Sequence, residues 1–127
     1  RVAVQVEKSP EALALYGACV MSGVVFLPLN TAYKADELEY FVTDSAAGAV
    51  VCGTEAEETL CRIAGEARVL TLDADGTGSL SDAAAGQPDD FTAVDRGDDD
   101  LAELAIQAAA GRLLLADTED PGEVPCD

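Results

Sequence analysis

The stretch that decides the fold is Gly23-Val24-Val25-Phe26-Leu27-Pro28-Leu29-Asn30. This short apolar run follows a glycine, is rich in residues that favour strands, and is interrupted by Pro28 before it ends at Asn30. Apolar runs of this length between glycine and proline are typical of a fully buried strand in a parallel sheet. Helical patterns lie on both sides of the run, which predicts an α/β arrangement around it.

The residues before this stretch predict a strand and a helix. Residues 2–6 form a compact β-branched run, which indicates a first strand. Ser9 can cap a helix that begins at Pro10 and ends near residue 22, with Gly23 as its stop. This helix carries two adjoining apolar stripes, which predicts that it packs against a sheet. The first stripe is Leu13, Tyr16, Gly17 and Val20, and the second is Ala12, Leu15 and Cys19.

The chain after Asn30 continues to alternate helices and strands. Thr54 followed by Glu57 has the capping-box pattern, which predicts that Thr54 caps a helix. Strands that alternate with helices in this way predict an α/β fold with a mostly parallel sheet. The expected elements are a turn over 31–34, a helix over 35–42, a strand over 49–52, a helix over 54–64 and a strand over 68–72.

The character of the sequence changes after residue 72, which divides the chain into four parts. Residues 1–72 are predicted to form the α/β subdomain. Residues 73–100 are an acidic loop and linker rich in Gly, Ala and Asp, with a short helix near 80–85. Residues 101–116 are predicted to form an Ala/Leu-rich helix, which could bind a partner, and residues 117–127 a disordered acidic tail.

The charge is strongly acidic, with 25 acids against 7 bases and a net charge of −18. Such a field repels phosphate backbones and anionic lipids, so we expect neither nucleic acid nor a membrane as a partner. No apolar run is long enough to cross a bilayer. The chain begins in a strand-like segment without Met or a signal-peptide pattern, so we expect this start to be internal to a longer protein.

Four cysteines are present, and none forms a Cys-x-x-Cys pair. Structural zinc sites need closely spaced Cys and His ligands, and this chain has no histidine. Cys19 and Cys52 lie in apolar runs and are predicted to be core residues. Scattered free thiols favour a reducing compartment, so we expect a cytoplasmic location.

Two acidic segments are candidate cation sites. The segment 73–78 resembles the start of a calcium loop, but the later position that should carry a bidentate Glu is Ala84. A turn after a strand is therefore the favoured interpretation. The run Asp98-Asp99-Asp100 fits the acidic N-terminus of the helix expected from Leu101.

The remaining candidate catalytic residues have ordinary interpretations. Ser9, Ser45 and Thr54 cannot be nucleophiles of a histidine-dependent triad, because the chain has no histidine. Lys8 and Lys34 lack the glycines of a phosphate-binding loop and are expected to be isolated surface cations.

Several segments together resemble the N-terminal portion of the AMP-forming acyl-CoA synthetases, the adenylate-forming ligases. The likeness covers residues 1–72 and fades towards residue 100. Residues 4–10 and 29–33 look most similar to the malonyl-CoA or methylmalonyl-CoA synthetase branch. The segments that carry the resemblance are Arg1-Val2-Ala3-Val4, Ser9-Pro10-Glu11, residues 23–30 and Glu37-Leu38-Glu39-Tyr40-Phe41.

The resemblance implies a two-step ligase. In this family a carboxylate attacks the α-phosphate of ATP to give an acyl-adenylate and pyrophosphate, and the thiol of CoA then displaces AMP. The chemistry needs a Gly/Ser/Thr-rich loop with a lysine, whose N–H groups and charge balance the triphosphate. ATP, Mg²⁺ and CoA are thus implied for the full-length protein, and none is expected to bind this chain.

The family's phosphate loop follows an acidic segment like residues 98–102. Here the chain continues Glu103-Leu104-Ala105-Ile106-Gln107-Ala108-Ala109-Ala110-Gly111, without a Thr-Ser-Gly-Thr-Thr-Gly element. No catalytic, cofactor-binding or metal-binding residue is therefore carried over from the family. Two hypotheses follow: an inactive N-terminal fragment of a malonyl-type ligase, whose partner is the rest of the enzyme, or a non-enzymatic α/β module that binds a partner.

Overall fold

The fold is built on a parallel sheet whose strands follow one another along the chain. The computed structural model describes residues 1–100, 104–109 and 112–117. Four strands lie in the order β2-β1-β3-β4, and all three neighbouring pairs are parallel. They are β1 (Val2–Gln5), β2 (Phe26–Pro28), β3 (Ala49–Cys52) and β4 (Arg68–Thr71). The predicted α/β fold with a mostly parallel sheet is confirmed.

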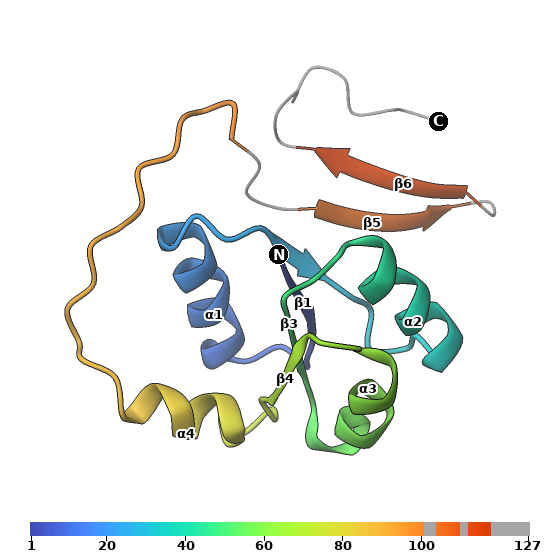
Figure 1. Cartoon of the computed structure of the whole chain (residues 1–127), viewed down its shortest axis with the longest axis horizontal. Coiled ribbons are helices and arrows are strands. Elements are labelled where there is room, and N and C mark those ends of the chain that lie inside the picture. The colour runs from blue at the N-terminus through green and yellow to red at the C-terminus, as the bar shows by residue number, and fades with distance from the viewer. Residues whose placement is uncertain (101–103, 110–111, 118–127) are drawn as a thin grey trace.

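Helices cover both faces of this sheet (Figure 1). Side chains of α1 and α4 pack on one face, and side chains of α2 and α3 pack on the other. A single 3₁₀ turn, η1, connects β3 to α3. The bounds are α1 (Pro10–Met21), α2 (Ala35–Asp44), η1 (Thr54–Ala56), α3 (Glu57–Ile63) and α4 (Ser79–Ala85).

The core divides into two clusters because successive strand residues point to opposite faces. Ala3 of β1 faces α2 and α3, whereas Val4 faces α1 and α4. β3 repeats the pattern, with Val50 in the first cluster and Val51 in the second. The larger cluster contains Ala3, Leu27, Leu29, Leu38, Phe41, Val42, Val50, Cys52 and Leu60.

The predicted ends of α1 are confirmed. Ser9 Oγ accepts a hydrogen bond from the Ala12 N–H at 3.0 Å, so Ser9 caps the helix. The helix stops before Gly23, whose φ of +67° lies in the left-handed region that glycine adopts readily. The Val24 N–H then donates to the Cys19 carbonyl at 2.9 Å and turns the chain towards β2.

The orientation of α1 shows which of its two predicted stripes lies nearer the sheet. In the first stripe, Leu13 is 72% exposed and Val20 is also exposed. The second stripe faces the sheet: Cys19 is buried, and Leu15 packs on the core beside Val4. Tyr16 of the first stripe also packs edge-to-face on Phe26 of β2, with ring centroids 5.1 Å apart, so the helix contacts the sheet through both stripes and leaves part of the first exposed.

The capping box predicted at Thr54 is also wrong. Thr54 lies inside η1, and α3 begins only at Glu57. The Thr54 hydroxyl donates to Asp73 Oδ2 at 2.6 Å and is therefore not a cap for the helix. A carboxylate that lies 19 residues away along the chain has displaced the local capping contact.

The helix predicted for residues 101–116 is wrong as well. Strands β5 (Leu104–Ala109) and β6 (Arg112–Asp117) occupy this region and pair antiparallel, with Leu104 opposite Asp117. Alanine and leucine favour helices, but cross-strand hydrogen bonds satisfy the backbone equally well. The glycine at position 111 was the signal against one continuous helix. Residues 101–103, 110–111 and 118–127, which include most of the predicted tail, lie outside the described residues.

The expectations for residues 73–100 agree with the structure. The short helix expected near residues 80–85 is α4, and residues 86–100 form an extended segment that returns alongside α1 (Figure 1). The Val94 N–H donates to the Met21 carbonyl at 2.8 Å. In the described part of the chain, no helix has the length and apolar character that a membrane span needs.

We predict that Leu27→Ala lowers the free energy of unfolding by about 2–5 kcal/mol, because Leu27 is fully buried in the central sheet and its truncation leaves a cavity. The matched control is Leu13→Ala at an exposed position of α1, which should change the free energy of unfolding by no more than about 0.5 kcal/mol. Urea unfolding followed by circular dichroism measures both. Equal losses in the two variants would contradict this assignment of the core.

Candidate functional site

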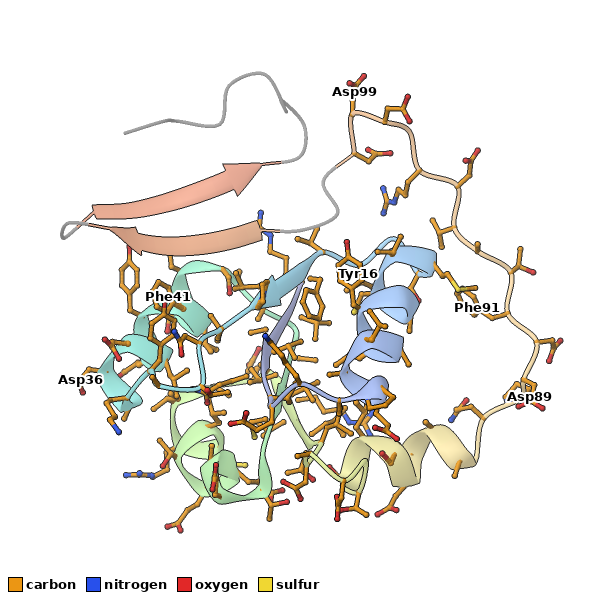
Figure 2. The ribbon with its side chains drawn as sticks, turned by 180° about the vertical axis from the view of Figure 1, so that it is seen from behind. Tyr16, Asp36, Phe41, Asp89, Phe91 and Asp99 are labelled. Atoms are coloured by element: carbon orange, nitrogen blue, oxygen red, sulfur yellow. The ribbon has the colours of Figure 1, made fainter. Side chains whose placement is uncertain are left out.

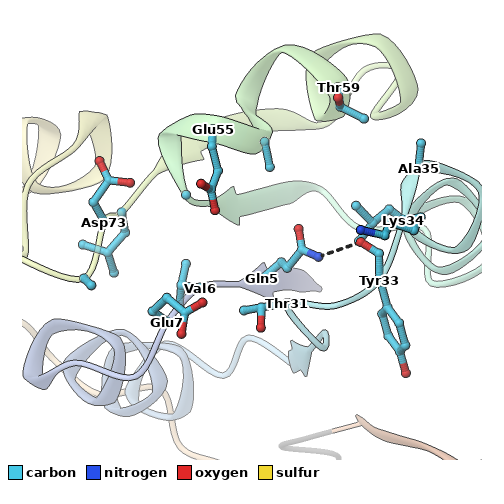
Figure 3. Close-up of a pocket in the computed structure, with 15 residues that line it drawn as sticks. Gln5, Val6, Glu7, Thr31, Tyr33, Lys34, Ala35, Glu55, Thr59 and Asp73 are labelled. Atoms are coloured by element: carbon cyan, nitrogen blue, oxygen red, sulfur yellow. Dashed lines mark hydrogen bonds between the residues drawn. The ribbon is translucent and has the colours of Figure 1, made fainter.

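A cavity of about 470 Å³ lies at the carboxyl ends of β1, β3 and β4. The chain leaves β1 to form β2 on one side and later returns to form β3 on the other, so the strand order reverses here. Parallel α/β sheets bind ligands outside the carboxyl ends of their strands at such a switch point. The polar side chains that line the cavity are Gln5, Glu7, Thr31, Tyr33, Lys34, Glu55, Thr59 and Asp73 (Figure 3).

Gln5, the last residue of β1, is only 6% exposed and holds the loop that follows β2. Its Nε2 donates to the Asn30 carbonyl at 3.0 Å and to the Tyr33 carbonyl at 3.4 Å. Because carbonyls only accept, these two bonds fix which end of the amide is the nitrogen. The Gln5 side chain therefore anchors residues 30–33 beside the cavity and directs its Oε1 away from that loop.

Asp73 follows β4 and binds the start of η1. Its Oδ1 accepts from the Thr54 N–H at 2.9 Å, and its Oδ2 accepts from the Thr54 hydroxyl at 2.6 Å. These two hydrogen bonds stabilise the charged form and hold the pKa of Asp73 below its usual value. The carboxylate thus joins the ends of β3 and β4 and stays ionised at neutral pH.

The segment 73–78 is a turn, as predicted, and its carboxylates are engaged by threonines. Thr77 donates to Asp75 Oδ1 through its N–H at 3.0 Å and its hydroxyl at 2.6 Å, which lowers the pKa of Asp75. Gly78 then passes close to the Thr71 carbonyl with a φ of +140°, where a side chain would collide with the backbone. The turn leads into α4 and passes so close to the backbone of Thr71 that only glycine fits at position 78.

The structure places the sequence-derived candidates apart from one another. Lys34 lies at the rim of the cavity, and the Ser9 hydroxyl caps α1. Ser45 is buried, and its hydroxyl donates to the Val42 carbonyl at 3.2 Å. Asp100 accepts from the Gly97 N–H at 2.8 Å and closes a turn. Sequence reasoning missed Gln5, Glu7 and Glu55, because the only signal for them was that polar residues stand at or near the end of a predicted strand.

The cysteines agree with the prediction of buried thiols. Cys19 and Cys52 are both buried, and Cys61 on α3 is exposed. Burial, assisted by the nearby Glu57, Cys61 and Asp73, raises the pKa of Cys52 to about 12. Cys52 is therefore a protonated core residue at neutral pH and not a nucleophile.

Comparison with known proteins now decides the family. A model of the AMP-binding enzyme family matches residues 1–112. The chain belongs to the AMP-binding enzymes. Among curated protein sequences, none gives a significant match.

Solved structures narrow the relationship. Apo MatB from Rhodopseudomonas palustris is 50% identical with a TM-score of 0.88, over 92% of this chain and 24% of MatB. ATP-bound MatB from the same organism is 49% identical with a TM-score of 0.89, over 92% of this chain and 24% of MatB. A fatty acyl CoA synthetase from Mycobacterium tuberculosis is 24% identical with a TM-score of 0.74, over 94% of this chain and 24% of that one, which shows the shared fold.

The predicted resemblance to acyl-CoA synthetases, and among them to the malonyl-CoA synthetase branch, is confirmed by these matches. The chain spans about a quarter of the length of the structures that it matches.

The described residues do not fit ATP with its metal ion. No group of three His, Cys, Asp or Glu side chains within residues 1–100 is arranged to hold a cation. The cavity carries Glu7, Glu55 and Asp73 against the single cation Lys34, and this balance repels a triphosphate. The lining of the cavity therefore does not supply the cationic groups that a triphosphate needs.

We predict that Thr54→Val raises the pKa of Asp73, because the variant removes one of its two hydrogen bonds. Thr77→Val is the matched control and should raise the pKa of Asp75 while leaving Asp73 unchanged. Carbon-13 NMR titration of the aspartate carboxyl groups measures both values. A rise at Asp73 in the control, or no rise in Thr54→Val, would contradict the pairing.

The sign of the accompanying stability change follows from the lowered pKa. Asp73 binds its proton less readily in the folded chain than in the unfolded one. The contact therefore stabilises the fold above the unfolded-state pKa, and this contribution is lost as the pH falls through the folded-state pKa. Thr54→Val should therefore reduce the loss of unfolding free energy as the pH falls through this range.

We also predict a strict order of thiol reactivity at neutral pH. In a Cys126→Ser background, which removes the cysteine outside the described residues, iodoacetamide should modify exposed Cys61 first. Cys19 and Cys52 should react only after unfolding, because their thiols are buried and their pKa values are raised. Mass spectrometry of peptides follows the order, and early modification of Cys52 would contradict the described core.

Proposed function

We propose that this chain is the N-terminal part of an ATP-dependent acyl-CoA synthetase of the malonyl-CoA type. The complete enzyme would join a carboxylic acid to CoA through an acyl-adenylate, with Mg²⁺ bound to the triphosphate. The observation that carries the proposal is the 50% identity with MatB over 92% of the chain. A reducing compartment such as the cytoplasm belongs to this proposal, because Cys19 and Cys52 are buried free thiols.

The second part of the proposal is that the chain alone is inactive. The sequence after Asp100 has alanines where the family has a Thr/Ser/Gly-rich loop, and a loop without hydroxyls or a lysine cannot balance a triphosphate. The partner would then be the remainder of the enzyme. Exposed apolar side chains of α1, which include Leu13, Val20 and Met21, offer a surface for it.

The same exposed side chains are also what favours the second candidate, a non-enzymatic α/β module that binds a different protein. The two candidates differ in one respect that can be measured. A piece of the enzyme must function when it is joined to the rest of MatB, whereas an unrelated binding module need not.

We predict opposite results for two chimeras with Rhodopseudomonas palustris MatB. Residues 1–100 of this chain, in place of the matching part of MatB, should support formation of malonyl-CoA from malonate, ATP and CoA. Residues 1–117 in the same position should lower kcat at least about 100-fold, because the phosphate-binding donors are lost. Unaltered MatB is the control, and release of pyrophosphate measures the first step.

The outcomes separate the two parts of the proposal. A folded but inactive first chimera would overturn the assignment as the N-terminal part of this enzyme. Equal activity of both chimeras would overturn the claim about residues 101–117. The isolated chain should show no heat of ATP binding in a calorimetric titration, and micromolar binding would likewise contradict the inactive fragment.

A further inference from the structure

We propose that the cavity at the carboxyl ends of β1, β3 and β4 binds a small organic cation through its ammonium or guanidinium group. This inference is independent of the proposed ligase activity, because it depends only on the described side chains around the cavity. The first support is a hydrogen-bond acceptor that the fold leaves open. The second is the charge around it.

The open acceptor is Gln5 Oε1. Gln5 is only 6% exposed, and its Nε2 donates to the Asn30 and Tyr33 carbonyls. No residue of the described chain donates a hydrogen bond to Oε1. In the same described residues, every side-chain oxygen or nitrogen that is sealed from solvent has a hydrogen-bond partner. Oε1 must therefore be reached from the cavity that Gln5 lines. It offers a fixed acceptor to a ligand that donates.

Carboxylates from separate elements line the same cavity as this acceptor. Glu55 comes from η1 and Glu7 from the segment after β1, on opposite sides of the strand end, and Asp73 lies at one end of the cavity (Figure 3). Lys34 lies on the side away from Asp73. Within the described residues, none of these four charged side chains forms an ion pair. The acidic end thus combines a net negative charge with an open acceptor.

Such a combination selects the chemistry of the ligand. A metal ion is disfavoured because the described Asp and Glu side chains form no group of three at ligating distance. An anion is disfavoured by three carboxylates against one ammonium. Ammonium and guanidinium groups are donors without acceptors, so they satisfy Gln5 Oε1 and the carboxylates at the same time. The cavity volume of about 470 Å³ is within the range of small-molecule sites.

The test compares ligands with and without a cation at the end of the side chain. L-citrulline has a neutral urea group in place of the guanidinium of L-arginine, and L-norleucine lacks the terminal ammonium of L-lysine. All four carry the same α-ammonium and α-carboxylate groups, so only the side-chain cation differs within each pair. Two-dimensional ¹H–¹⁵N NMR of the chain should show saturable shifts at Val6, Thr31 and Gly53 with arginine or lysine. Citrulline should bind at least about fivefold more weakly than arginine, and norleucine at least about fivefold more weakly than lysine. Added salt should weaken the binding of arginine.

Variants test the residues that carry the inference. Glu7→Gln and Glu55→Gln keep the shape of exposed side chains, so the chain should fold and bind arginine about fivefold more weakly in each case. Glu58→Gln on the exposed part of α3, outside the cavity, is the matched control and should leave binding unchanged. Equal binding of arginine and citrulline, unchanged binding in both cavity variants, or no saturable shift at concentrations on the order of 10 mM would overturn the proposal.

The source of the cation is decided in the chimera that contains residues 1–100. If arginine still binds there, the occupant is a free organic cation. If the cavity no longer accepts arginine and Glu55→Gln instead destabilises the chimera, the occupant is a basic side chain from the rest of the enzyme. Failure of ligase activity in that chimera would not affect the result obtained with the chain itself.

Discussion

The structure depends on the confinement of β1 between two parallel neighbours. Ala3 is paired with Leu27 on one side and with Val50 on the other, and it has no exposed surface. A shift of β1 by one residue would move its core residues to the opposite faces and break both ladders. The register of β1 therefore fixes where β2 and β3 end, and with them the loops at the carboxyl edge of the sheet.

The cavity inherits its geometry from this register. Gln5 is the last residue of β1, and its position determines where the loop after β2 is anchored. Asp73 follows β4 and binds Thr54 after β3, so two strands that are neighbours in the sheet are also joined beyond their ends. Sheet pairing and polar contacts thus act on the same edge, where they order the segments that line the cavity.

The sequence was sufficient for the elements whose signals are local. Four apolar runs predicted the four strands, and Ser9, Pro10 and Gly23 predicted both ends of α1. It failed where side-chain or cross-strand contacts override local propensity. Thr54 binds Asp73, 19 residues away, and residues 104–109 pair with residues 112–117 as two strands, although local propensity favoured a cap and a helix. Gln5 could not be recognised as part of a site, because its role depends on two carbonyls at positions 30 and 33.

The family relationship and the cavity concern different chemistry. A site for ATP must supply cationic groups and N–H donors to a triphosphate, whereas the cavity here supplies carboxylates and a carbonyl oxygen. One pocket cannot satisfy both requirements, since each lining group that stabilises a cation repels a phosphate. The net charge of the cavity therefore follows from which side chains stand at the strand ends, whereas the family relationship follows from the sequence and fold of the whole sheet.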